Sequence, residues 1–232
     1  MKSLYLLVDF CTLLVPFAFS FHPRINFHKT WKAFFPANII ASLIFLIWDS
    51  IFVNKGVWGF NEKYILGIDV FNIPIEEILF FFCIPYACVF TYHCLSLFVK
   101  IEWKVNTENI VSIAIVFLLF ITGIIFYNRV YTSVTFISTA VLLLFLKFMF
   151  KVTWLQKLLS IYPILLLPFF IVNGILTGSG LQEPVVWYND VENLGIRLIT
   201  IPVEDIFYGF ELILLNIFLF EYLKNKVNVN PY

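Results

Sequence analysis

The chain has 232 residues, of which 61% are hydrophobic and only 13% are charged, and its formal net charge is zero. Soluble domains are usually about half apolar and roughly a quarter charged, so this composition excludes a water-soluble globule and indicates an integral membrane protein. The balanced charge gives no reason to expect a nucleic-acid partner.

Seven apolar runs are long enough, or nearly long enough, to cross a lipid bilayer. In chain order, we predict helices over residues 3–20, 34–53, 75–98, 108–126, 132–150, 159–177 and 203–223. The sequence therefore predicts an all-α integral membrane protein with about seven transmembrane helices, whose partner is the lipid bilayer.

The basic residues predict an orientation, because cytoplasmic segments of membrane proteins are enriched in Lys and Arg. With the N-terminus outside, the outer segments hold only Lys2, Lys55, Lys63, Arg129 and Arg197 of the fifteen Lys and Arg residues. We therefore predict a multi-pass protein of the cell (inner) membrane, with the N-terminus outside and the C-terminus in the cytoplasm.

A proline followed by two acidic residues opens two of the predicted helices. Residues 74–77 read Pro-Ile-Glu-Glu at the third helix, and residues 202–205 read Pro-Val-Glu-Asp at the seventh. Proline suits the first helical turn because its missing N–H would be unpaired there, and acids are favoured by the positive end of the helix dipole. In the predicted orientation, both acidic pairs open on the outer side.

The chain repeats itself around this proline–acid motif. Gly67 stands seven residues before Pro74, and Gly195 stands seven residues before Pro202. Three helices and one linker helix bring the fifth helix back in the direction of the first, so we predict two parallel three-helix repeats that share one composite site. The predicted divisions are a first repeat over residues 1–104, a linker helix over 105–128, and a second repeat over 129–232.

Further polar and aromatic residues accompany the two motifs. A carboxylate inside a membrane helix normally faces the bundle interior and indicates function. Glu204, Tyr208 and Glu211 follow the i, i+4, i+7 spacing of one helix face, and Phe80 holds the matching position in the first half. The candidate substrate-binding or supporting residues are Asp9, Trp48, Asp49, Trp58, Phe80, Asn173, Trp187, Tyr208 and Glu211.

These residue types suit one kind of chemistry. Four acids at two facing helix mouths in a poorly solvated place should not all ionise, so one can act as a general acid beside a conjugate base. Aromatic faces attract cations without supplying a nucleophile. Together they suit the acid-initiated rearrangement of an alkene. The acids as helix caps, and Trp58 and Trp187 as part of an interfacial aromatic belt, stay open as alternatives.

The chain resembles the lycopene cyclase domain family, the membrane carotenoid cyclases of the heterodimeric type, here with two repeats fused in one chain. The resemblance rests on Trp48-Asp49, Gly56-x-Trp58-x-Phe60, Gly67 and Pro74-x-Glu76-Glu77, echoed by Trp187, Gly195 and Pro202-x-Glu204-Asp205. It implies an isomerase of the intramolecular lyase type, a lycopene beta-cyclase, which closes the ψ-end groups of lycopene to β-type rings (γ-/β-carotene) by acid-initiated, redox-neutral cyclisation. It also implies lycopene or a related linear carotenoid as substrate, other membrane enzymes of the carotenoid pathway as partners, and no cofactor or metal ion.

The catalytic candidates are the four acids of the two motifs, Glu76, Glu77, Glu204 and Asp205. Glu76 and Glu204 are the first choices, because the glutamate two residues after proline is the same in both halves; which acid donates and which accepts stays open. The second half departs from the first, with Asn173 in the place of Asp49 and Asp205 in the place of Glu77. This difference indicates that the two halves have different tasks.

Two other functions stay open. One is a non-enzymatic membrane protein that binds carotenoid or transports a small solute, with the acids as its proton relay. The other is a membrane prenyl transferase, whose aspartate-rich magnesium motif is weakly resembled by residues 189–192. A prenyl transferase would need magnesium and a diphosphate substrate.

Overall fold

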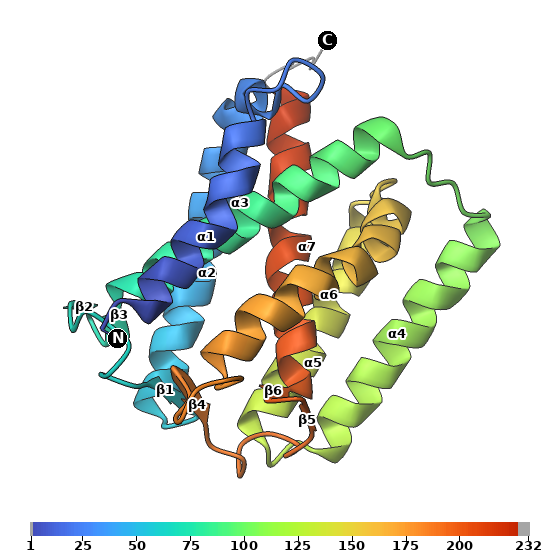
Figure 1. Cartoon of the computed structure of the whole chain (residues 1–232). Helices are drawn as coiled ribbons and strands as arrows, with labels where there is room; N and C mark the ends of the chain where they lie inside the picture. The colour runs from blue at the N-terminus through green and yellow to red at the C-terminus, as the bar shows by residue number, and fades with distance from the viewer. Residues whose placement is uncertain (1, 227–232) are drawn as a thin grey trace.

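The computed structural model describes residues 2–226 of the chain, and within them the protein is a bundle of seven α-helices (Figure 1). Their bounds are α1 (Leu4–Phe19), α2 (Trp31–Asn54), α3 (Ile75–Phe98), α4 (Val105–Ile125), α5 (Val130–Leu144), α6 (Leu155–Leu176) and α7 (Val203–Lys226). Six of these segments are long and apolar enough to cross a membrane. The prediction of an all-α, multi-pass membrane protein is confirmed.

The first helix differs from the other six. It is an apolar helix of 16 residues, which covers about 24 Å at 1.5 Å per residue, less than the ~30 Å hydrocarbon core of a bilayer. Two short helical segments extend their neighbours: η1 (Phe27–Thr30) leads into α2, and η2 (Phe145–Met149), a π-helical turn, continues α5. The observed bounds of several helices differ by a few residues from the ranges predicted from the apolar runs.

Six short strands form three two-stranded antiparallel sheets, and the helix pattern of the sequence gives no sign of them. The pairs are β1 (Trp58–Phe60) with β4 (Val186–Tyr188), β2 (Asp69–Val70) with β3 (Ile73–Pro74), and β5 (Arg197–Leu198) with β6 (Ile201–Pro202). In Figure 1, β1, β4, β5 and β6 lie at the lower end of the bundle, and β2 and β3 lie at its lower left side; we call this part of the bundle the strand end. In the first pair, Gly59 lies opposite Trp187, so this sheet joins the long loops of the two halves.

The other two sheets are equivalent hairpins that lead into α3 and α7. In each hairpin the proline of the motif pairs with a residue five positions earlier, Asp69 with Pro74 and Arg197 with Pro202. Each tip places an apolar residue in the left-handed region, Phe71 at φ 56° and Ile199 at φ 64°. Because side chains of this kind rarely adopt a positive φ, the shared conformation is a specific mark of the internal repeat.

The packing of the helices separates an apolar end from the strand end. Helix α1 packs on α3, α2 on α7, and α4 on α5 at the edge of the bundle (Figure 1). Large buried side chains such as Phe27, Phe34 and Phe220 fill the end where α2 begins and α7 finishes. The buried acids of the two motifs lie at the opposite end, where α3 and α7 both begin.

Candidate functional site

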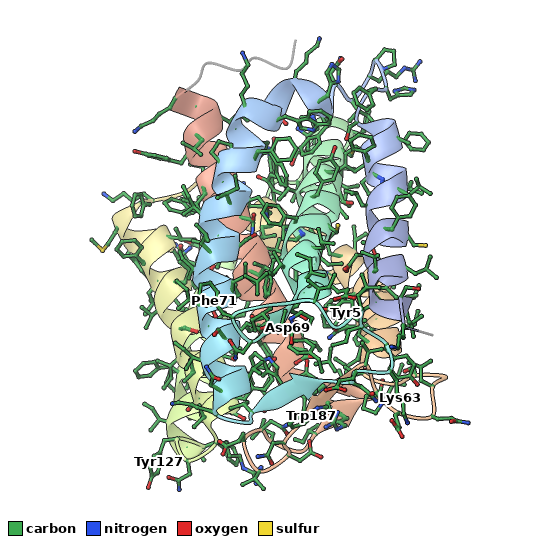
Figure 2. The ribbon with its side chains drawn as sticks, turned by 90° about the vertical axis from the view of Figure 1, so that its left-hand side faces the viewer. Tyr5, Lys63, Asp69, Phe71, Tyr127 and Trp187 are labelled. Atoms are coloured by element: carbon green, nitrogen blue, oxygen red, sulfur yellow. The ribbon has the colours of Figure 1, made fainter. Side chains whose placement is uncertain are left out.

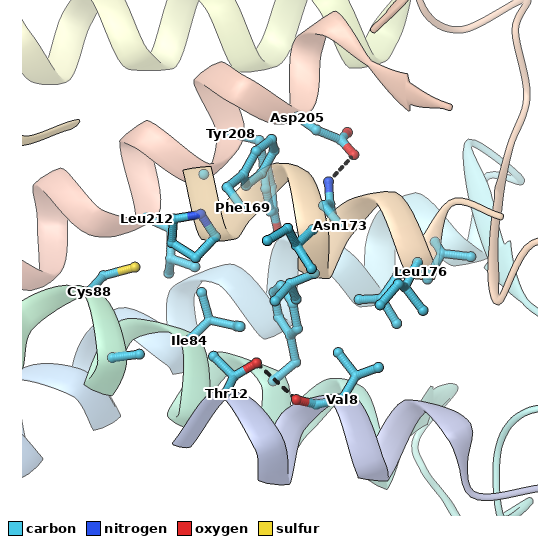
Figure 3. Close-up of a pocket in the computed structure, with 18 of the residues that line it drawn as sticks. Val8, Thr12, Ile84, Cys88, Phe169, Asn173, Leu176, Asp205, Tyr208 and Leu212 are labelled. Atoms are coloured by element: carbon cyan, nitrogen blue, oxygen red, sulfur yellow. Dashed lines mark hydrogen bonds between the residues drawn. The ribbon is translucent and has the colours of Figure 1, made fainter. Parts of the chain in front are cut away.

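A cavity of about 590 Å³ lies between α1, α3, α6 and α7. Figure 3 shows Val8 and Thr12 of α1 on one side of it, and Tyr208 and Leu212 of α7 on the other. Its size is within the range of roughly 300–1,000 Å³ that is usual for small-molecule pockets. Apolar side chains line most of its length, and its acidic residues gather at the strand end.

Three carboxyl groups line this polar end, one from each of three helices: Asp49 of α2, Glu77 of α3 and Asp205 of α7. They are 2%, 7% and 4% exposed. Among the lining residues of the described chain there is no Lys, Arg or His. Three negative charges in so dry a place would repel one another strongly.

In the first half, Glu77 has one hydrogen-bonding partner, Tyr5, and several acidic neighbours, Asp9, Asp49 and Asp205. The hydroxyl of Tyr5, the second residue of α1, donates to Oε2 of Glu77. Asp49 lies close enough for its charge to interact with that of Glu77, and its Oδ2 is buried without a hydrogen-bond partner among the described residues. This half therefore presents two carboxyl groups and little to balance their charge.

In the second half, Asp205 is surrounded by donors. Tyr131 donates to its Oδ1 at 2.5 Å, while Tyr188 and Asn173 donate to its Oδ2 at 2.9 Å and 2.8 Å (Figure 3 draws the bond from Asn173). Hydrogen bonds to an ionised acceptor are the strong ones, so these three stabilise a negative charge on Asp205. The two halves thus share a tyrosine–acid contact and differ in everything else around the acid.

The first acid of each motif, Glu76 or Glu204, does not line the cavity and binds the loop before its helix. The backbone N–H of Leu66 donates to Oε1 of Glu76 at 2.7 Å, and that of Leu194 donates to Oε1 of Glu204 at 2.7 Å. The hydroxyl of Thr132 also donates to Glu204, at 2.5 Å. Both glutamates are fully buried and do not line the cavity. Their identity in the two halves is explained by this shared contact with a loop amide ten residues earlier.

Aromatic rings surround the three cavity acids. Trp58, Phe80 and Tyr208 all line the cavity. The ring of Trp58 lies 5.0 Å from that of Tyr131 and 6.0 Å from that of Tyr208, centroid to centroid. The rings of Tyr131 and Tyr188 stack at 6.0 Å. Such a wall of π faces can stabilise a positive charge without reacting with it.

The comparison with known protein families matches the chain in two regions, one in each half of the structure. The family model described as lycopene cyclase matches residues 2–95 and 128–223. The chain belongs to the lycopene cyclase family. This confirms the resemblance drawn from the doubled motif, together with the internal repeat, and it supports a carotenoid cyclase in general. The domain boundaries at residues 104 and 128 stay a prediction.

A curated relative adds a shorter match. The bifunctional lycopene cyclase/phytoene synthase of Aspergillus niger is 36% identical over 53 residues, which cover 23% of this chain and 9% of that relative. The chain therefore matches only a small part of a much longer protein. No solved structure matches the chain.

Three further candidates from the sequence, Trp48, Asp9 and Glu211, do not line the cavity. Trp48 packs behind Tyr208, with ring centroids 5.2 Å apart. Asp9 is buried on α1, and neither of its carboxyl oxygens has a partner among the described residues. Glu211 accepts hydrogen bonds from Ser138 and Thr139 of α5 at 2.8 Å and 2.9 Å. The helix face predicted for α7 is thus divided, since Glu204 and Glu211 contact α5 whereas Tyr208 lines the cavity.

Trp187 lies on the outside of the strand end, where Figure 2 also shows Lys63. It is 43% exposed and covers Gly59, where an added Cβ would come within 2.4 Å of Cζ2 of Trp187. Its neighbour Tyr188 lines the cavity, as Val186 does, and donates a hydrogen bond to Asp205. In the register of the sheet, Tyr188 is also the residue opposite Trp58.

Two tyrosines of the site, Tyr5 and Tyr131, were missed in the sequence. Tyr5 and Tyr131 occupy the second position of α1 and of α5, the first helix of each half. An alignment of the two first helices, and not only of the motif helices, would have revealed this pair.

The segment compared with a magnesium motif has another role. Arg197 donates to Oδ1 of Asp190 at 2.6 Å in an exposed turn outside the cavity. Partial burial opposes ionisation of Asp190, but the hydrogen bonds from Arg197 and Asn193 outweigh it and lower the pKa of this carboxyl. The turn is therefore held by an ion pair, and it gives the prenyl transferase alternative no support.

Proposed function

We propose that this protein cyclises the ψ-end groups of lycopene, or of a related linear carotenoid, to β-type rings. The product would be γ-carotene and then β-carotene, and the enzyme an isomerase of the intramolecular lyase type. The observation that carries this proposal is the meeting of Glu77 and Asp205, from the two repeats, at the one acidic end of an otherwise apolar cavity. Family membership supports the same substrate class.

The reaction needs a proton donor, a proton acceptor and a dry chamber. A carboxyl group adds its proton to the terminal double bond of the end group and leaves a tertiary carbocation. The neighbouring double bond attacks this cation, which forms the carbon–carbon bond of the ring and moves the positive charge into the ring. A carboxylate then removes a ring proton, so the proton gained equals the proton lost and no oxidant or reductant is consumed.

The surroundings of the two acids support a division of these roles. Glu77 has a single hydrogen-bond donor in Tyr5 and lies beside Asp49, so a proton shared by these two acids relieves their repulsion. Asp205 accepts three hydrogen bonds, which favour its charged form. We assign the role of proton donor to the pair of Glu77 and Asp49, and the role of proton acceptor to Asp205.

The aromatic rings around the acids also contribute to the proposed reaction. Tyr208 lines the cavity, and its hydroxyl has no hydrogen-bond partner among the described residues. Trp58 and Phe80 present rings beside the acids. These groups would stabilise the carbocation and exclude the water that could capture it. We retain the N-out, C-in orientation in the cell membrane as part of the proposal, so that the acidic end of the cavity lies near the outer face.

Pigment analysis tests the function directly. We expect expression in lycopene-producing cells to convert red lycopene to cyclic carotenoids, which chromatography separates, while Glu77→Gln and Asp205→Asn accumulate lycopene at equal protein level. A carotenoid binder or transporter would leave the pigment chemically unchanged, and a prenyl transferase would leave lycopene as it is. Unchanged lycopene with the wild-type protein, present and folded in the membrane, would overturn the proposal.

A further inference from the structure

The cavity is open to one side, between α1 and α6. The lining residues from the other elements are buried or half-buried, but on these two helices the lining includes exposed side chains. Leu7 of α1 is 50% exposed and Ile171 of α6 is 67% exposed, and Cys11 and Pro168 are exposed as well. A side chain that lines a cavity and also faces outward marks its mouth, so these four residues form a rim.

The rim faces the part of the molecule that a membrane would cover. Leu7 and Cys11 are four residues apart on α1, and Pro168 and Ile171 are three residues apart on α6, so each pair lies on one helix face. Pro168 has no N–H to donate along the helix, and α6 is therefore easier to deform at the rim than an uninterrupted helix. A molecule that passes this rim comes from the hydrocarbon of the bilayer and not from water.

The wall between the rim and the acids offers no polar handle. The hydroxyl of Thr12 is used by the carbonyl oxygen of Val8 at 2.8 Å, and that of Thr91 by the carbonyl oxygen of Ala87 at 2.8 Å. The hydroxyl of Tyr162 donates to the backbone carbonyl of Ile206. Because the helices themselves satisfy these groups, the wall is effectively apolar, and only the strand end can recognise a polar or charged feature of a ligand.

The length of the chamber limits how much of a substrate it can hold. The lining residues on α3 run from Glu77 to Thr91, which is about 21 Å at 1.5 Å per residue. With a volume of about 590 Å³, the chamber accommodates one end of an extended carotenoid and not the whole molecule. The remainder of the chain has to leave the chamber through an apolar opening.

We propose that the gap between α1 and α6 is a lateral portal for a linear polyene. One end group reaches the acids at the strand end while the rest of the hydrocarbon chain passes between Leu7, Cys11 and Ile171 into the lipid. This inference rests on the proposed function for its choice of ligand. It adds where the substrate enters and which residues select an acyclic, rod-like hydrocarbon.

Narrowing the rim tests the portal. Leu7→Trp and Ile171→Trp add bulk at the mouth, and we expect each to lower the rate of lycopene conversion about tenfold or more, since overfilling a fitted space is costly. Leu118→Trp and Ile113→Trp on α4 are matched controls, because these residues are 61% and 51% exposed and belong to a helix that does not line the cavity. The controls should convert lycopene at the wild-type rate. Equal rates in rim and control variants would overturn the portal.

A second measurement does not depend on turnover or on tryptophan variants that fold poorly. In the Glu77→Gln protein with Cys83, Cys88 and Cys94 changed to Ala, lycopene in the bilayer should slow the reaction of Cys11 with a lipid-soluble maleimide several-fold. The matched control carries Leu118→Cys on α4 in place of Cys11, and its labelling should not change. If lycopene slows the labelling of Cys11 but the wild-type protein does not convert lycopene, the portal is supported and the cyclase function is refuted. Conversion without protection would retain the cyclase and refute the portal.

Discussion

Glu76 and Glu77 are adjacent, buried and chemically alike, and they make different contacts in the structure. Glu77 lines the cavity, whereas Glu76 accepts the backbone N–H of Leu66 and does not reach the cavity. We therefore expect Glu77→Gln to remove most of the cyclisation with little loss of stability. We expect Glu76→Gln to weaken the loop and to leave the chemistry in place.

The magnitudes follow from the contacts. Loss of a positioned general acid typically lowers a rate about 10²–10⁴-fold, which is the effect expected for Glu77→Gln. A hydrogen bond to a charged acceptor contributes about 1.5–3 kcal/mol, and a neutral amide oxygen in its place about 1 kcal/mol. Glu76→Gln keeps an oxygen near the 2.7 Å contact with Leu66, so it should lower the free energy of unfolding by about 0.5–2 kcal/mol.

The comparison needs two assays on the same four variants. Pigments are separated after a short induction in lycopene-producing cells, with conversion divided by the amount of folded protein, and thermal unfolding is measured in detergent. Asp205→Asn and Glu204→Gln repeat the comparison in the second half, where Glu204 accepts the N–H of Leu194. If Glu76→Gln loses as much conversion per folded molecule as Glu77→Gln, the assignment of the two acids is refuted.

Three smaller changes test other contacts. Tyr131→Phe removes one of three hydrogen bonds to the second-half acid, and pigment analysis should find conversion about tenfold slower or worse. Gly59→Ala should lower the free energy of thermal unfolding by about 1–3 kcal/mol, because its Cβ would meet the indole of Trp187 at 2.4 Å. Lys63 lies 2.7 Å from Glu183, and its hydrogen bond lowers the pKa of that carboxyl. The ion pair therefore stabilises the loops fully at pH values above 4.5, the ordinary pKa of a glutamate. This stabilisation is lost as the pH falls through the lowered pKa. Limited proteolysis at decreasing pH should find that Glu183→Gln removes this acid dependence, with a small effect because the pair is exposed.

The helices could be predicted from the sequence because the bilayer leaves few choices. A backbone that crosses lipid has to satisfy its own hydrogen bonds, so a long apolar run becomes a helix almost regardless of its detailed composition. The strands could not be predicted in this way. Each has only two or three residues, too few for an alternating pattern, and β1 finds its partner β4 more than a hundred residues away.

The site could be predicted only in part. The proline–acid motif correctly indicates where α3 and α7 begin, because proline and first-turn acids are favoured there for local reasons. Which of two adjacent acids points into the cavity depends on the rotation of the helix, and neighbours differ by about 100° around the axis. That rotation is set by packing against other helices. The sequence therefore favoured Glu76 and Glu204, whereas the cavity is lined by Glu77 and Asp205.

The difference between the halves has a consequence for how two rings would form. Asp49 beside Glu77 places an acid next to an acid, which favours a shared proton, whereas Asn173 beside Asp205 places an N–H donor next to an acid, which favours a charge. Two identical halves would give the reaction no direction; under the proposed assignment, this exchange of side-chain type helps to distinguish a donor side from an acceptor side. Since both sides are fixed, each end group has to reach the acids in the same pose. A long carotenoid with two such ends would therefore leave after its first ring, turn round in the lipid and enter again, so the two rings form in separate binding events.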